Sequence, residues 1–94
     1  MTFEEYLVQV NRDYVDNAPT LRLGQQYSNT LHLAKPALGK YIAERVPNVD
    51  PFYDDARLPE FLEYVAGIWN SPWTDFTLEE YGLLRWRDPE ESDQ

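Results

Sequence analysis

The chain contains no cysteine and only one histidine among its 94 residues. The absence of cysteine excludes disulfide bonds, thiolate nucleophiles and cysteine-based metal sites. No apolar run approaches the ~20 residues that a membrane-spanning helix needs. The acidic start of the chain has neither the basic flank nor the apolar core of a secretion signal. We therefore expect a cytoplasmic protein with no membrane partner.

Basic residues are also scarce, with 8 Lys and Arg against 17 Asp and Glu and a net charge of -9. Binding to phosphate needs a basic footprint, so we expect no direct contact with nucleic acid. The charge is unevenly distributed. Residues 17–49 carry a net charge of +3, whereas residues 1–16 carry -3, residues 50–63 carry -4 and residues 64–94 carry -5. This separation indicates either pairing within the fold or a negative surface that attracts a basic partner.

Apolar residues recur at helical spacing in four stretches, and no stretch shows sustained alternation with a period of two. The pattern predicts helices over residues 3–15, 21–34, 36–46 and 59–70. A capping-box match from Thr77 to Glu80 predicts a further short helix over 78–85. We expect an all-α single domain over residues 1–87, a bundle of about four helices with an aromatic-rich C-terminal segment. Residues 88–94 are expected to form a disordered acidic tail.

Several side chains are candidates for helix caps between these elements. Thr20 precedes the second helix and is expected to cap it. Asp50 and Pro51 read as the cap and first residue of one short helical turn. Asp54 or Asp55 is expected to cap the turn that follows, with Arg57 as a local partner of these carboxylates.

The three carboxylates of Asp50, Asp54 and Asp55 are also a candidate site for calcium or magnesium. Their spacing lacks the glycine and the terminal glutamate of a calcium loop, so capping is the preferred interpretation. His32 follows Ser28 by one helical turn, but no carboxylate is placed to orient it as a catalytic base. We expect no catalytic residue, no metal site and no cofactor.

Aromatic residues are abundant, with 3 Trp, 7 Tyr and 4 Phe in this small domain. Five of them crowd the last third of the chain: Trp69, Trp73, Phe76, Tyr81 and Trp86. They either hold the C-terminal segment against the bundle or anchor an interface with a partner. Trp73 and Trp86 lie outside strong helical stripes, and we expect both to be partly exposed.

Two stretches carry a resemblance to a known group of proteins. Residues 22–31 read RLGQQYSNTL, and residues 50–62 read DPFYDDARLPEFL. With the aromatic first helix, they resemble the small acidic uncharacterised proteins of tailed phages and prophages over residues 3–70. The resemblance implies a phage product in the bacterial cytoplasm that binds host proteins or assists replication and assembly. It implies no catalytic residue.

These observations predict a non-catalytic protein–protein interaction module, a phage or prophage accessory protein that binds a host protein with a basic patch. The expected contact residues are Asp50, Asp54, Asp55, Trp73 and Trp86. One alternative is an inhibitor that mimics DNA and occupies the site of a host nuclease or defence complex. A second is a metal-dependent enzyme that uses the aspartate cluster. The sequence leaves the oligomeric state open.

Overall fold

The computed structural model of the chain describes residues 1–17 and 20–83. This part of the chain is built from helices and contains no strand, which confirms the all-α class. Its α-helices are α1 (Phe3–Asn17), α2 (Leu23–Ala34), α3 (Pro36–Arg45), α4 (Leu58–Ile68) and α5 (Leu78–Leu83). Three short 3-10 helices connect them: η1 (Pro47–Val49), η2 (Asp55–Arg57) and η3 (Pro72–Asp75). The expected tail over 88–94 lies outside the described residues.

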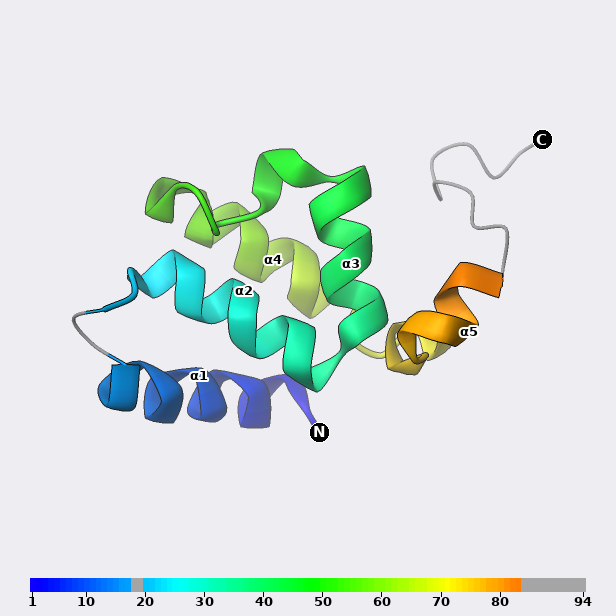
Figure 1. Cartoon of the computed structure of the whole chain (residues 1–94), viewed down its shortest axis with the longest axis horizontal. Helices are drawn as coiled ribbons and strands as arrows, with labels where there is room; N and C mark the ends of the chain where they lie inside the picture. Colours follow the sequence, from blue (N-terminus) through cyan, green and yellow to red (C-terminus); the bar gives the residue numbers. More distant parts are fainter. Residues whose placement is uncertain (18–19, 84–94) are drawn as a thin grey trace.

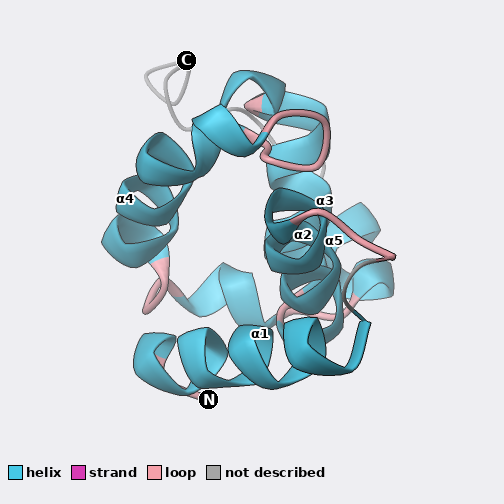
Figure 2. Cartoon of the chain, turned by 90° about the vertical axis from the view of Figure 1, so that its left-hand side faces the viewer, coloured by secondary structure: helices cyan, strands magenta, loops and turns pink. Residues whose placement is uncertain are grey.

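The first three helices form the base of the domain. α1 lies alongside α2, and α3 folds back from the end of α2 (Figure 1). In the view turned by 90°, α4 faces α2 and α3 while α1 closes one side (Figure 2). α5 lies beyond α3, at the opposite end of the molecule from the C-terminal end of α1 (Figure 1). α4 is therefore the wall of the bundle opposite the α2–α3 pair.

The core between these walls is largely aromatic. Tyr6 of α1, Tyr27 of α2 and Phe61 of α4 form a chain of edge-on ring contacts, with centroids 6.2 and 6.3 Å apart. Trp69 packs on Tyr6 at 5.2 Å, and its indole N–H donates to the Met1 carbonyl at 3.0 Å. The Tyr6 hydroxyl donates to the Tyr27 carbonyl at 2.6 Å. Rings with a hydrogen-bonded polar end thus tie together three helices that are distant in sequence.

The beginning of α1 follows the sequence pattern. The Thr2 N–H donates to the Glu5 carboxylate at 2.7 Å, and the Glu5 N–H donates to the Thr2 hydroxyl at 3.1 Å. This reciprocal capping box satisfies two donors that a helix start leaves without partners. The hydrogen bond from the Thr2 backbone favours the charged carboxylate and lowers the pKa of Glu5.

The beginning of α2 differs from the sequence prediction. The helix begins at Leu23, after an extended Arg22, and Thr20 lies in the preceding turn without capping it. The Arg22 N–H donates to the Gln25 side chain at 3.0 Å, so the glutamine supplies the cap. The guanidinium of Arg22 is thereby left facing the segment around residue 55, where it has a different role.

The predicted turn at Asp50–Pro51 forms as a single hydrogen-bonded turn and not as a helix, with the Asp54 N–H donating to the Pro51 carbonyl at 3.2 Å. Helical turns form on either side of it, as η1 and η2, while Asp50 is extended. A residue that precedes proline is disfavoured in the helical region, which stops η1 at this point. The Asp50 carboxylate accepts from the Phe52 N–H at 3.0 Å, so it stabilises a local turn instead of a helix start.

Candidate partner-binding site

The aspartate cluster is held by backbone amides within the molecule. Asp54 accepts from the Ala56 N–H at 2.9 Å and caps η2, as the sequence predicts. Asp55 accepts from the Gly24 N–H at 2.9 Å and from the Arg22 guanidinium at 3.0 Å. Asp50 is buried with 7% of its surface exposed. Of the three carboxylates, only that of Asp54 is exposed and without an ion-pair partner among the described residues.

These contacts join the two stretches that carry the phage-protein resemblance. Arg22 also donates to the Phe52 carbonyl, and Gly24 lies directly against the backbone of Pro51. A β-carbon at Gly24 would come within 2.3 Å of the Pro51 carbonyl oxygen. Glycine at this position is therefore explained by close packing between α2 and the 50–57 segment.

Arg57 has a different partner from the one expected. Its guanidinium donates to the Pro47 carbonyl at 3.1 Å and to the Asp50 carbonyl at 3.3 Å, which links the two 3-10 turns. The prediction that Arg57 pairs with Asp54 or Asp55 was therefore wrong. The Asp55 carboxylate is already bound to α2, across 33 residues of sequence.

His32 is used locally on α2. Its Nδ1 lies 2.9 Å from the Ser28 carbonyl oxygen, one turn earlier in the helix. A carbonyl only accepts hydrogen bonds, so Nδ1 carries the proton in this contact. The ring bonds the Ser28 backbone and packs on Gly39, which has no side chain to obstruct it.

The C-terminal segment is anchored by Lys35, the single residue between α2 and α3. Its ammonium group donates to the Trp69 carbonyl at 2.9 Å, the Thr74 hydroxyl at 2.8 Å and the Asp75 carboxylate at 2.7 Å. It also lies 4.6 Å from the centre of the Trp69 ring. With three acceptors and an aromatic face, this lysine is buried with its charge compensated.

Trp73 belongs to the same internal packing. It is half-buried, with its ring 5.0 Å from that of Tyr41 and 6.4 Å from that of Tyr81. Trp73 therefore helps to hold η3 and α5 against α3. Trp86, the other expected contact residue of this segment, lies outside the described residues.

A shallow groove of about 430 Å³ runs along the outer face of α4. The Glu60 and Glu63 side chains are exposed on its rim, and Tyr64 and Ile68 form half-buried apolar walls. Neither glutamate has an ion-pair partner within residues 1–17 and 20–83. We call this surface the α4 groove; its lining residues are Val49, Glu60, Glu63, Tyr64, Gly67 and Ile68.

Gly67 has no internal explanation, unlike Gly24. A β-carbon added there would meet nothing within 4 Å, and the backbone is not in the left-handed region that favours glycine. Glycine inside a helix costs up to ~1 kcal/mol relative to alanine. Its presence in the last turn of α4 leaves room for an external group to approach the helix backbone.

The sequence reasoning missed the α4 groove. None of the residues that line the groove was among the expected contact residues. A glycine within an amphipathic helix, on the face away from the apolar stripe, was the available signal. The aspartates were expected as contacts because they are close in sequence, although each of the three carboxylates accepts a backbone hydrogen bond within the fold.

Comparisons with protein-family models, curated proteins and solved structures gave no match for this chain. Within residues 1–17 and 20–83, no group of three or more histidine or carboxylate side chains is arranged to hold a metal ion. In the same part of the chain, no helix combines the length and apolar character needed to cross a bilayer.

Proposed function

We propose that the protein is a non-catalytic interaction module that binds a basic patch of a host protein through the α4 groove. In this proposal it acts as a phage or prophage accessory protein in the bacterial cytoplasm. The observation that carries the proposal is the combination in one groove of two glutamates that have no ion-pair partner among the described residues, apolar walls and an unexplained glycine.

The groove has the chemical composition of a small docking site. Interface cores are apolar, and charged groups at their edges steer encounter and set register. Tyr64 and Ile68 offer partly exposed apolar surface, while Glu60 and Glu63 lie one helical turn apart on the rim. A lysine or arginine of the partner would pair with the rim while its aliphatic stem covers the walls.

The charge around the groove favours the same partner. Residues 50–63, which include both groove glutamates, carry a net charge of -4, and the exposed Asp54 also has no ion-pair partner among the described residues. A field of this sign accelerates association with a basic surface and weakens as salt increases. The negative charge left after internal pairing is thus placed where a partner can reach it.

The test is affinity capture from lysate of the bacterial host, with the double variant Glu60→Lys/Glu63→Lys compared with the wild type. For the glutamate double variant, we expect the amount of captured specific partner to fall at least tenfold, measured by quantitative mass spectrometry. Its affinity for the purified partner should fall by a similar factor. The matched control is Asp16→Lys/Glu79→Lys, which changes the net charge equally at two exposed carboxylates away from the groove. Equal capture by both double variants would contradict the proposal.

Gly67 provides a second test that does not alter charge. Gly67→Leu fills the groove with a side chain that the structure accommodates without an internal clash. Helicity and thermal stability should be retained or increased because leucine is the better helix former. Partner affinity should fall at least tenfold, and unchanged affinity would show that nothing approaches this helix closely.

Adding duplex DNA to the binding assay separates this proposal from DNA mimicry. A mimic competes with DNA for the same site on its target, and its affinity falls steeply with salt. Displacement of the protein by DNA would favour the mimic. Binding that persists in excess DNA supports an ordinary protein–protein contact.

A further inference from the structure

The outer face of α1 is a second surface, separate from the α4 groove. Seven large hydrophobic side chains are exposed in the described part of the chain, and four of them belong to this side of the molecule. Val8 and Val15 lie seven residues apart on α1, and therefore on one helical stripe. Met1 lies at the start of the same stripe, and Leu33 of α2 borders a depression of about 280 Å³ beside Met1.

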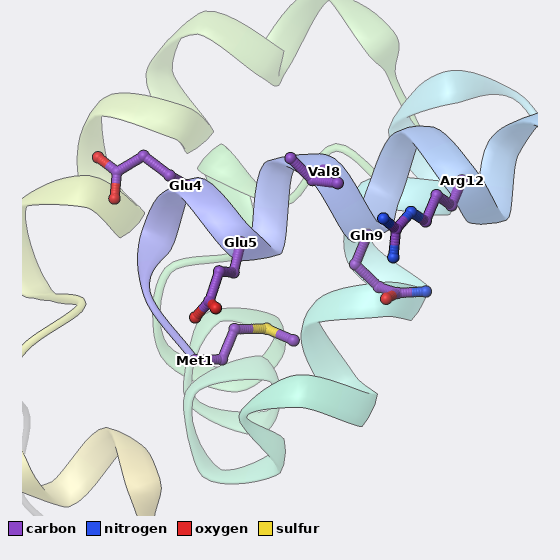
Figure 3. Close-up of a pocket in the computed structure, with 6 residues that line it drawn as sticks. All are labelled: Met1, Glu4, Glu5, Val8, Gln9 and Arg12. Carbon is purple, nitrogen blue, oxygen red and sulfur yellow. The ribbon is translucent and has the colours of Figure 1, made fainter.

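Two charged residues flank this stripe symmetrically. Glu4 precedes Val8 by four residues and Arg12 follows it by four, so both lie one turn from Val8 on its own side of the helix. Figure 3 shows Glu4 near the start of the helix, Arg12 toward its other end and Val8 between them. Together with Met1, Glu5 and Gln9, they line an open groove of about 540 Å³.

Glu4 and Arg12 have no ion-pair partner within the described residues. They cannot pair with each other, because eight residues of helix separate them by ~12 Å along the axis. The monomer therefore presents an acid and a base at equal distances on either side of an exposed valine.

We propose that this face binds a second copy of the chain, with the two α1 helices antiparallel and Val8 against Val8 on a twofold axis. In this register, Glu4 of each copy lies opposite Arg12 of the other, and Met1 lies opposite Val15. A twofold interface repeats every contact, so the single Glu4–Arg12 match gives two ion pairs. The same stripe would thus satisfy both its charges and its apolar residues at once.

The dimer should be weak. The contact runs for ~21 Å along one helix pair, which is short for the roughly 1,200 Å² that stable interfaces bury. Each copy also carries a net charge of -9, which opposes association beyond the local pairs. We therefore expect a dissociation constant on the order of 100 μM at physiological salt.

The register is tested by charge reversal. Glu4→Arg alone places two arginines opposite each other at both ends of the contact, and Arg12→Glu alone places two glutamates there. Each variant should therefore dimerise about tenfold more weakly than the wild type. An equimolar mixture of the two variants provides a complementary test, because the two different chains can form a mixed dimer.

In the proposed register, the mixed dimer places an arginine of one variant opposite a glutamate of the other at both ends of the contact, so mixing should restore association. A mixture that associates no better than either variant alone would contradict the register. The double variant Glu4→Arg/Arg12→Glu exchanges the two charges within one chain and restores both ion pairs. It should therefore dimerise at the wild-type concentration. Sedimentation velocity over a concentration series measures the wild type, both single variants and the double variant.

Val8→Asp tests the apolar centre and should abolish the dimer. Leu83→Asp is the matched control, because it introduces the same charge at an exposed apolar side chain on α5. Circular dichroism shows whether each variant stays folded. A wild-type chain that sediments as a monomer up to about 1 mM would overturn the proposal. A double charge variant that stays monomeric while the wild type dimerises would overturn the antiparallel register.

Discussion

The two ends of α2 hold two irregular segments of the chain by the same means, but in different environments. At the beginning of the helix, Arg22 pairs with Asp55 and holds the 50–57 segment. Just after its end, Lys35 pairs with Asp75 and holds η3. The Arg22 and Asp55 side chains are each 45% exposed, whereas the Lys35 side chain is 4% exposed.

From this difference we expect exposure to matter more for stability than the pairing itself. Exposed ion pairs contribute little because water already solvates both charges. Removing the acceptors of a buried ammonium group, or the donor of buried acceptors, lowers the free energy of unfolding much more. The C-terminal junction should therefore depend on its lysine, while the 50–57 junction should depend mainly on close backbone packing at Gly24.

Replacing the buried cation should have the largest effect. Lys35→Met keeps the aliphatic volume but removes the charged donor to the Trp69 carbonyl and to the buried Thr74 hydroxyl, and leaves that carbonyl only its hydrogen bond from Thr74. We expect a loss of about 2–4 kcal/mol in the free energy of unfolding, measured by urea denaturation. Asp75→Asn is the control, because Asp75 is 75% exposed and should contribute far less. Equal losses in both variants would show that the ion pair, not the buried hydrogen bonds, holds η3.

The next largest effect tests close packing at the other junction. Gly24→Ala introduces a β-carbon 2.3 Å from the Pro51 carbonyl and crowds the Asp55 carboxylate. We expect destabilisation of about 1–3 kcal/mol from overpacking, although alanine is the better helix former. Gly67→Ala is the matched control at an open site and should be neutral or stabilising. A neutral Gly24→Ala would mean that the 50–57 segment moves away at little cost.

The buried Tyr6 hydroxyl is a neutral hydrogen-bond donor that can be compared with the two ion pairs. Burial is the main reason that the pKa of Tyr6 is raised far above its usual range. The folded state thus keeps this proton when the unfolded state loses it, so stability is retained below pH ~10 and declines above it. Tyr6→Phe should cost about 1 kcal/mol at neutral pH and reduce the alkaline loss. Thermal melts from pH 8 to pH 11 measure both effects, and an unchanged alkaline slope would assign that loss to other groups.

The smallest effect is expected at the exposed ion pair. Arg22→Met should cost less than about 1 kcal/mol, because both charges are half exposed and the Gly24 N–H still holds Asp55. Melts at low and high salt provide the measurement, with the wild type losing more stability to salt than the variant. A loss as large as that of Lys35→Met would refute the distinction drawn between the two junctions.

Much of the helical architecture could be predicted from local sequence. The expected helices over 3–15 and 36–46 match α1 and α3 to within two residues because capping residues and prolines act on their immediate neighbours. The helices expected over 59–70 and 21–34 match α4 and α2 to the same tolerance, but the first ends two residues early, at Ile68, and the second starts two residues late, at Leu23. In both cases the misplaced end borders a turn whose hydrogen bonds involve distant parts of the fold.

The candidate site was less predictable than the helices. Asp50 and Asp55 were expected to face a partner, but their roles depend on Phe52 and on Gly24 and Arg22 of α2. Adjacency in sequence gave no information about a contact across 31 residues. Conversely, the outward direction of Glu60 and Glu63 follows from the burial of Phe61 and Val65 on the opposite side of α4.

The helical class, the negative charge and most helix boundaries follow from the amino-acid order alone, because they depend on composition and on residues within one or two turns. Which charges are paired and which remain available is decided by the packing of whole helices. That packing determines whether a carboxylate meets a distant amide, a guanidinium or water. It assigns Asp55 and Lys35 to the fold, and leaves Glu60, Glu63, Glu4 and Arg12 without an ion-pair partner in the described part of the chain.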